Sequence, residues 1–207
     1  MYVPDHFAIT DEAQVHALMA AHPLAALVTT GEGGLEATHL PLLLDSSRGK
    51  QGVLQGHFAR ANTHWKRVGA ETDALAIFTG ADAYITPSWY PTKQETGKVV
   101  PTWNYSAVHV TGRLTIHDDV DWLEGFLRHL TDIHEAELPE PWSIDDAPDG
   151  YIRTIARGVV GIELEISRID AKAKLSQNRS TPDHDGVARG LQARGLNAVA
   201  AAVSKTR

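Results

Sequence analysis

Three stretches of the sequence contain more polar and aromatic side chains than a surface loop requires: residues 56–65, 84–105 and 172–179. Closely spaced donors, acceptors and flat rings of this kind bind anionic groups and planar ligands. The chain has no cysteine, which excludes disulfides, thiolate metal sites and cysteine nucleophiles. Any chemistry must therefore come from other side chains or from a cofactor.

The first stretch, GHFARANTHW, lies at a predicted junction between a strand and a helix. Hydrogen-bond donors lie beside the helix start at His57, Arg60, Asn62 and Thr63, an arrangement that suits a phosphate or a carboxylate. The alternative is that Asn62 or Thr63 only caps the helix and that Arg60 is solvated. Composition gives these two interpretations about equal weight.

The second stretch, ITPSWYPTKQETGKVVPTWNY, follows no regular period and is predicted to be a long, ordered loop. Its aromatic residues are Trp89, Tyr90, Trp103 and Tyr105, and its polar residues include Ser88, Lys98, Thr102 and Asn104. Flat apolar groups next to donors and acceptors are typical of a pocket for a planar ligand. Burial in the core is the alternative for each aromatic residue. For the third stretch, Lys174 to Arg179, a solvated strand exit is the preferred interpretation.

Other signals of chemistry are weak. The chain has 11 histidines, but it lacks an H-E-x-x-H motif, and no carboxylate accompanies the pair His57 and His64, so no metal site is predicted. Hydrolase and phosphate-loop motifs are absent as well. The net charge of −7 argues against broad nucleic-acid binding, and no convincing helix-turn-helix is present.

Strands predominate among the elements that must position these stretches. Hydrophobic patterning predicts strands over 24–30, 35–44, 53–58, 74–80, 108–117 and 159–169, with a glycine turn, GEGG, after the first. It predicts helices over 10–22, 61–69, 118–134, 151–158 and, weakly, 183–205. Strands in hairpin order with helices between and after them indicate an α+β fold, mainly antiparallel β, built as a barrel or sheet with peripheral helices.

The organisation that we expect is a barrel domain over residues 1–180, with a C-terminal helical tail, 181–207, packed on the same domain. No window is long or apolar enough to cross a bilayer. The N-terminal residues do not resemble a secretory signal, so a cytoplasmic protein is expected.

Six stretches together resemble the PaiB-like FMN-binding negative regulators. They are MYVPDHF, THLPLLL, GHFARANTHW, YITPSWYPTK, VPTWNYSAVHVTG and KAKLSQN. They occur in the family's order and span nearly the whole chain, which makes the set far more specific than any one member.

The resemblance implies an FMN-binding split β-barrel that works as a homodimer with flavin sites at the subunit interface. Members of the family are described as transcriptional regulators, of protease production and sporulation in the type case. Because this chain is acidic and has no convincing DNA-reading element, we expect a flavin-dependent sensor whose effect on DNA is indirect.

The same resemblance places individual residues around FMN. The phosphate end is expected near His57, Arg60, Asn62 and Trp65. The ring and ribityl end is expected near Ser88, Trp89, Tyr90, Lys98, Thr102, Trp103 and Asn104, with Lys174, Ser176 and Gln177 arriving from the C-terminal segment or the partner subunit. The family often carries proline and glutamine where this chain has Thr63 and His64, so neither of these is assigned a role.

Two functions fit these expectations. One is a flavin-binding negative regulator or sensor without turnover of its own, and the other is an FMN-dependent oxidoreductase related to pyridoxamine-phosphate oxidases and flavin reductases. Only Lys98, Tyr90 and Tyr105 stand out as acids or bases in the aromatic loop, which favours regulation. A barrel that binds haem or no cofactor fits less well, because the donor-rich stretch suits a phosphate.

Overall fold

The computed structural model describes residues 1–31, 33–69 and 72–206. The chain divides into two compact units. The barrel unit comprises Pro23–Ile77 and Val110–Ile169, and the terminal unit comprises Met1–His22, Phe78–His109 and Asp170–Arg207. Residue 32 of the predicted glycine turn and residue 207 of the predicted tail lie outside the described residues.

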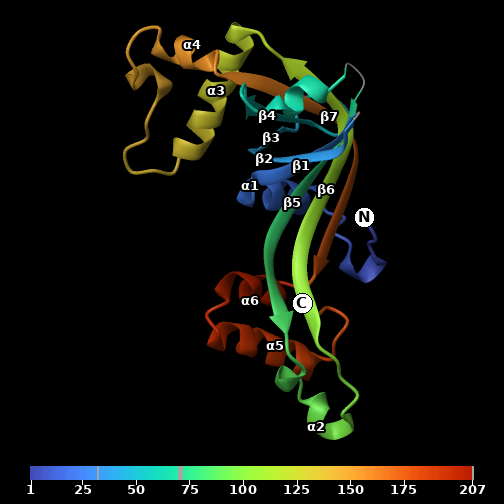
Figure 1. The fold of residues 1–207 in the computed structure, drawn as a ribbon. Helices are drawn as coiled ribbons and strands as arrows, with labels where there is room; N and C mark the ends of the chain where they lie inside the picture. Colours follow the sequence, from blue (N-terminus) through green and yellow to red (C-terminus); the bar gives the residue numbers. More distant parts are fainter. Residues whose placement is uncertain (32, 70–71, 207) are drawn as a thin grey trace. The chain divides into compact units, whose positions relative to one another are not determined.

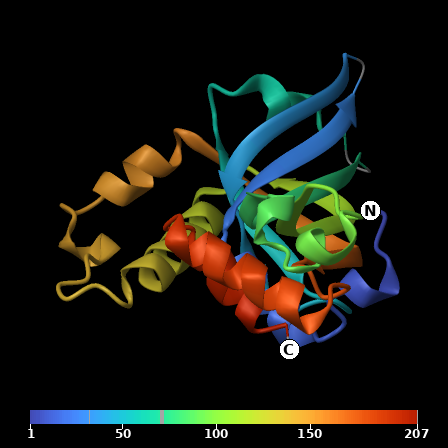
Figure 2. The same cartoon turned by 90° about the horizontal axis from the view of Figure 1, so that it is seen from below.

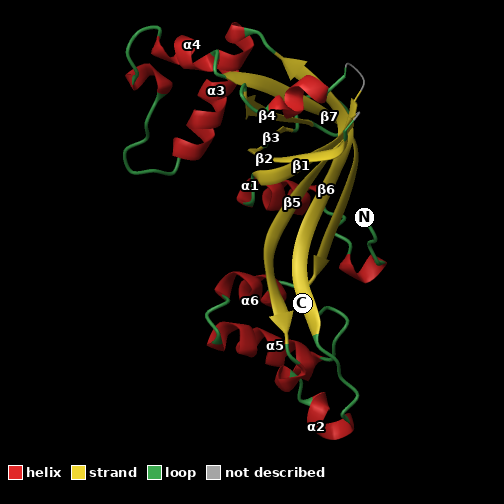
Figure 3. Cartoon of the chain, viewed as in Figure 1, coloured by secondary structure: helices red, strands yellow, loops and turns green. Residues whose placement is uncertain are grey.

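The described residues form seven strands of one antiparallel sheet, in the order β2-β1-β5-β6-β7-β4-β3 (Figures 1 and 3). The strands are β1 (Leu24–Gly31), β2 (Gly34–Pro41), β3 (Leu43–Asp45), β4 (Val53–Ala59), β5 (Thr72–Ile85), β6 (Thr102–His117) and β7 (Val159–Lys174). Buried residues alternate with less buried ones, as at Ala25, Leu27 and Thr29 of β1. The predicted α+β, mainly antiparallel fold is confirmed.

The barrel unit contains both edges of this sheet. β2 and β3 are the edge strands, yet only Leu42 separates them in the chain, so the sheet must curl far enough to bring its two edges near each other. The Leu42 N–H donates to the Pro23 carbonyl at 2.9 Å and leaves the ladder, so the strand predicted over 35–44 is in fact two strands. Gly56 of β4 permits close packing here, since a Cβ at this position would lie 2.6 Å from Leu42 Cδ2.

Three strands are longer than the sequence pattern indicated. β5 runs on to Ile85, β6 begins at Thr102 and β7 ends at Lys174. Each of these strands therefore starts in one unit and ends in the other. The prediction stopped short because the apolar alternation on which it rested fades in these segments, although the extended backbone continues.

The region predicted as an irregular loop contains two short helical segments. The 3₁₀ turn η3 (Pro87–Trp89) begins after Thr86, whose side chain caps it. Helix α2 (Thr92–Thr96) ends at Gly97, which has a φ of +63°, a left-handed conformation that glycine adopts without strain. The remainder of this region, up to β6, is irregular.

Five more α-helices lie among the described residues. They are α1 (Glu12–Ala21), α3 (Val120–Glu135), α4 (Tyr151–Ala156), α5 (Thr181–Ala193) and α6 (Asn197–Ser204). Asp119 caps α3 by accepting a hydrogen bond from the Trp122 N–H at 2.8 Å. Among the described helices, none combines the length and the apolar character that crossing a membrane requires.

The predicted C-terminal tail is two helices rather than one, because Gly195 (φ +71°) ends the first of them. Figures 1 and 2 show α5 and α6 side by side in the terminal unit. Tyr90, Val187, Leu191 and Val203 belong to the hydrophobic core of this unit. The domain boundary that the sequence suggested at residue 180 stays a prediction.

Candidate functional site

The strand-end stretch, residues 56–65, lies in the barrel unit where β4 ends. After β4 the chain enters a 3₁₀ turn, η2 (Thr63–Arg67), in place of the predicted longer helix. The Asn62 side chain caps this turn by accepting a hydrogen bond from the His64 N–H at 3.0 Å. Asn62 therefore has the capping role that the sequence left as one of its two alternatives.

Arg60 of this stretch is held by the protein itself. Its guanidinium forms a bidentate pair with Asp118 and also donates to the carbonyls of Arg157 (2.6 Å) and Val159 (2.9 Å). The pair raises the pKa of Arg60 and lowers the pKa of Asp118, mainly through the hydrogen bonds between them. These contacts tie the end of β4 to the start of β7 and to the residues before α3.

Arg60→Ala should therefore lower the stability of the fold. Loss of the carbonyl bonds and of a partly exposed ion pair is expected to cost about 1–2 kcal/mol, which lowers the thermal midpoint by a few degrees. Arg157→Ala is the matched control, because Arg157 contributes only its backbone carbonyl to these hydrogen bonds and alanine retains that carbonyl. The predicted phosphate contact of Arg60 adds a second expectation, a larger loss of affinity for FMN than for riboflavin. Equal losses for both ligands would contradict that contact.

His64 is fully buried beside this turn, in a small polar cluster. One ring nitrogen lies 2.7 Å from Thr29 Oγ1 and the other 2.8 Å from Thr38 Oγ1. The Asn62 amide donates to the same Thr38 hydroxyl at 3.1 Å. Burial lowers the pKa of His64, so its ring is neutral near pH 7. Sequence reasoning missed both threonines because they lie on other strands, without a motif of their own.

The other two predicted residues of this stretch are also engaged within the barrel unit. Trp65 donates from its indole N–H to the Arg60 carbonyl at 3.0 Å. His57 packs edge-on against Phe126, with their ring centres 5.8 Å apart, and burial lowers its pKa. The structure thus brings Arg60, Asn62 and Trp65 together, while His57 lies against α3.

The terminal unit contains a pocket of about 230 Å³ at the ends of β6 and β7. Its lining consists of Phe7, Thr102, Asn104, Lys174, Ser176, Asn178 and Arg179. Four of these, from two separate stretches of the sequence, were predicted as ligand contacts: Thr102, Asn104, Lys174 and Ser176. Because β6 and β7 are neighbours in the sheet, the fold brings the two stretches together.

Hydrogen bonds hold these pocket residues in place. Lys174 Nζ donates to Thr102 Oγ1 at 2.5 Å, and the buried Asn104 amide donates to Ser176 Oγ at 2.9 Å. Ser176 has a φ of +68°, a left-handed conformation that is uncommon for a residue other than glycine and is often found at functional sites. Gln177 stabilises this bend by accepting from the Leu175 N–H at 2.7 Å. Its side chain thus supports the pocket rather than lining it.

The predicted aromatic residues have different environments within the terminal unit. Trp89 packs on α5, where a Cβ at Gly190 would lie 2.3 Å from its ring. Tyr90 is buried in the core, and burial raises the pKa of its hydroxyl. Trp103 is 49% exposed and donates to Asp82 Oδ1 at 2.8 Å. Burial in the core was the alternative considered for each aromatic residue. Of these three residues, Tyr90 has that role.

Ser88 and Lys98 are exposed at the surface of the terminal unit. Three pocket residues were absent from the predicted contacts: Phe7, Asn178 and Arg179. Asn178 is the last residue of the KAKLSQN stretch and Arg179 directly follows it, so both belong to the third polar stretch, residues 172–179, although neither was chosen as a contact. The Arg179 guanidinium lies over the Tyr90 ring, 4.8 Å from its centre.

The chemistry of this pocket suits the polar edge of a planar ring. Among the described residues, its lining provides two cations, Lys174 and Arg179, several neutral donors and acceptors, and no carboxylate. Phe7 adds an aromatic surface. The volume is below the roughly 300–1,000 Å³ of pockets that enclose whole ligands, so this pocket would hold one end of a larger molecule.

Comparison with known proteins gives a family model and a curated relative. The model described as "Putative FMN-binding domain" matches residues 1–168. The protein named "Protease synthase and sporulation protein PAI 2" from Bacillus subtilis is 33% identical over 192 residues, which cover 93% of this chain and 89% of the relative.

Solved structures resemble the fold. The flavocytochrome Anf3 from Azotobacter vinelandii aligns with a TM-score of 0.57 at 17% identity, over 87% of this chain and 74% of that one. The conserved hypothetical protein Rv2991 from Mycobacterium tuberculosis aligns with a TM-score of 0.60 at 10% identity, over 87% and 94% of the two chains. At these identities, the likeness concerns the fold alone.

Proposed function

Because the chain belongs to this FMN-binding family, whose model spans residues 1–168, we propose that it binds FMN with the pyrimidine edge of the ring in the terminal-unit pocket. The observation that carries this proposal is the lining of that pocket. The pyrimidine edge presents alternating carbonyl and N–H groups, and Asn104, Ser176 and Thr102 offer both donors and acceptors. When bound, FMN supplies hydride or electron transfer chemistry.

Lys174 has the clearest role in this proposal. One of its N–H groups is used by Thr102 Oγ1, which orients the ammonium and leaves two donors for a ligand. A cation at the pyrimidine edge stabilises negative charge on that part of the ring. The rigid bend at Ser176 holds the hydroxyl and the Asn104 amide in position before the ligand arrives.

The biological role that we favour is negative regulation or sensing. The Bacillus relative is named for protease synthesis and sporulation, and a flavin whose oxidation state responds to the cell would provide a signal. A net charge of −7 disfavours contact with the DNA backbone, so the protein would act through a partner. As in the family that it resembles, it would be a cytoplasmic homodimer with flavin sites at the interface.

An FMN-dependent oxidoreductase is the second candidate, and the pocket cations favour it, since they would stabilise a reduced ring. Two assays on the FMN-loaded protein separate the candidates. A regulator that acts through a partner should oxidise NADH or NADPH no faster than free FMN does, and should not shift its promoter DNA at moderate salt. Steady NADH or NADPH oxidation would establish the enzyme instead, and a DNA shift would establish direct regulation.

A further inference from the structure

The negative charge of the protein is concentrated in one segment of the barrel unit. Residues 118–158 contain eleven aspartates and glutamates but only three arginines and no lysine, a net charge of −8. The whole chain has a net charge of −7, so all other residues together carry +1. This segment, called here the acidic segment, includes α3, the turn η4 (Ile144–Asp146) and α4.

The acidic segment also exposes large apolar side chains. Ile133, Leu138, Trp142, Tyr151 and Ile155 are all between 44% and 52% exposed. Tyr151 and Ile155 are four residues apart on α4, so they lie on the same face of that helix. Exposed apolar groups that cluster within a charged surface are typical of a protein interaction site.

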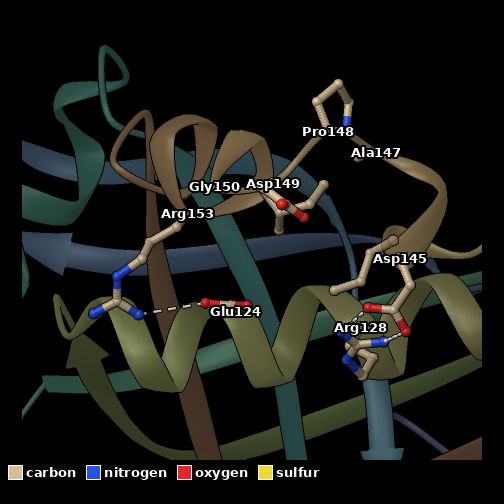
Figure 4. Close-up of a pocket in the computed structure, with 10 residues that line it drawn as sticks. Glu124, Arg128, Asp145, Ala147, Pro148, Asp149, Gly150 and Arg153 are labelled. Atoms are coloured by element: carbon tan, nitrogen blue, oxygen red, sulfur yellow. Dashed lines mark hydrogen bonds and ion pairs between the residues drawn. The ribbon is translucent and has the colours of Figure 1, made fainter.

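A pocket of about 430 Å³ lies within the same segment (Figure 4). Arg128 on α3 forms a bidentate pair with Asp145, with both distances 2.6 Å. Arg153 on α4 donates to Asp121 at 2.5 Å and to Glu124 at 3.4 Å. Both pocket cations are thus neutralised by carboxylates.

Asp149 is a further carboxylate of this pocket. Among the described residues it has no ion-pair partner within 4.0 Å. The pocket therefore carries surplus negative charge, and a cation from outside would complete its pairing.

We infer that the acidic segment docks a basic, amphipathic segment of a partner protein. A lysine or arginine of the partner would enter the pocket beside Asp149, while its apolar side chains would cover Tyr151 and Ile155. Charge complementarity selects this occupant, because nucleic acids and anionic membranes would be repelled. A second copy of this chain is a poorer occupant, because its residues outside the acidic segment carry a net charge of only +1.

This inference rests on the proposal that the protein acts through a partner, and it can be tested with defined probes. The FMN-loaded full chain is titrated into a labelled helical peptide of leucine and lysine, and binding is followed by fluorescence anisotropy. A peptide with glutamate in place of lysine is the comparison. We expect the lysine peptide to bind at least about tenfold more tightly.

Two variants localise the effect. Asp149→Asn and Tyr151→Ser, both at exposed positions, should each weaken the lysine peptide roughly fivefold or more. Leu35 is an apolar residue of the barrel unit that lies outside the segment and is 78% exposed, so Leu35→Ser should not change binding of the peptide.

Equal binding of the two peptides, or unchanged binding by both variants, would overturn the inference. Conversion of a dimer into monomers by Tyr151→Ser, measured by sedimentation, would also overturn it, because the occupant would then be a second copy. FMN uptake is measured in the same samples to distinguish the two proposals. If the unaltered chain takes up no FMN, flavin binding is refuted, but the docking surface is not.

Discussion

Lys174→Met is expected to weaken binding of FMN and of riboflavin by a similar factor, roughly tenfold or more. The ammonium at the pocket end of β7 is proposed to contact the ring, which both ligands share, rather than the phosphate. Methionine retains the length of the side chain but cannot donate a hydrogen bond. Titration of each ligand, followed by flavin fluorescence, measures both affinities.

Lys174→Met should also change the reduction potential of the flavin that still binds. Without the cation, negative charge on the reduced ring is less stabilised, so we expect the two-electron reduction potential to fall by about 30 mV or more. Lys205→Met, at an exposed position of the same unit, is the matched control. A loss confined to FMN would place Lys174 at the phosphate, and unchanged affinity for both ligands would remove it from the site.

Gly112→Ala is expected to destabilise the barrel strongly. A Cβ at this position of β6 would lie 2.1 Å from the Glu165 carbonyl oxygen and 2.6 Å from Leu164 Cδ2, both on β7. Backbone cannot move aside as a flexible side chain can, so the two strands must separate. A cost of about 3 kcal/mol is expected, which corresponds to a fall of roughly 6–12 °C in the thermal midpoint.

Gly125→Ala provides the opposite case within the same unit. Gly125 lies in α3, and nothing would contact a Cβ there within 4 Å. Alanine is the better helix former, so this substitution should stabilise the protein by up to about 1 kcal/mol. Thermal unfolding followed by circular dichroism compares the two variants. A Gly112→Ala protein as stable as the unaltered chain would show that β6 and β7 are not packed as described.

Hydrophobic periodicity predicted the class of fold, because residues 108–117 of β6 and 159–169 of β7 alternate clearly between apolar and polar side chains. It did not predict the break at Leu42, which depends on a hydrogen bond to Pro23 and thus on the curl of the sheet. It also missed the extensions of β5, β6 and β7, where the apolar alternation fades. The family, the split-barrel fold and FMN as its cofactor, all inferred from six short stretches, are confirmed.

The candidate site was predictable in part. Lys174 and Thr102 were both selected from composition and resemblance, but their hydrogen bond depends on the pairing of distant strands, which a single sequence does not reveal. The partner of Arg60, Asp118, lies 58 residues away, and nothing in the local pattern links the two. The individual flavin contacts stay predictions.

Titration of the purified chain with FMN tests the central claim most directly. If the account is correct, the absorption and fluorescence of FMN change and reach saturation, with a Kd of about 1 µM or below. Riboflavin should show the same change of the ring spectrum, since the ring enters the pocket. Absence of any change at micromolar FMN would contradict the account.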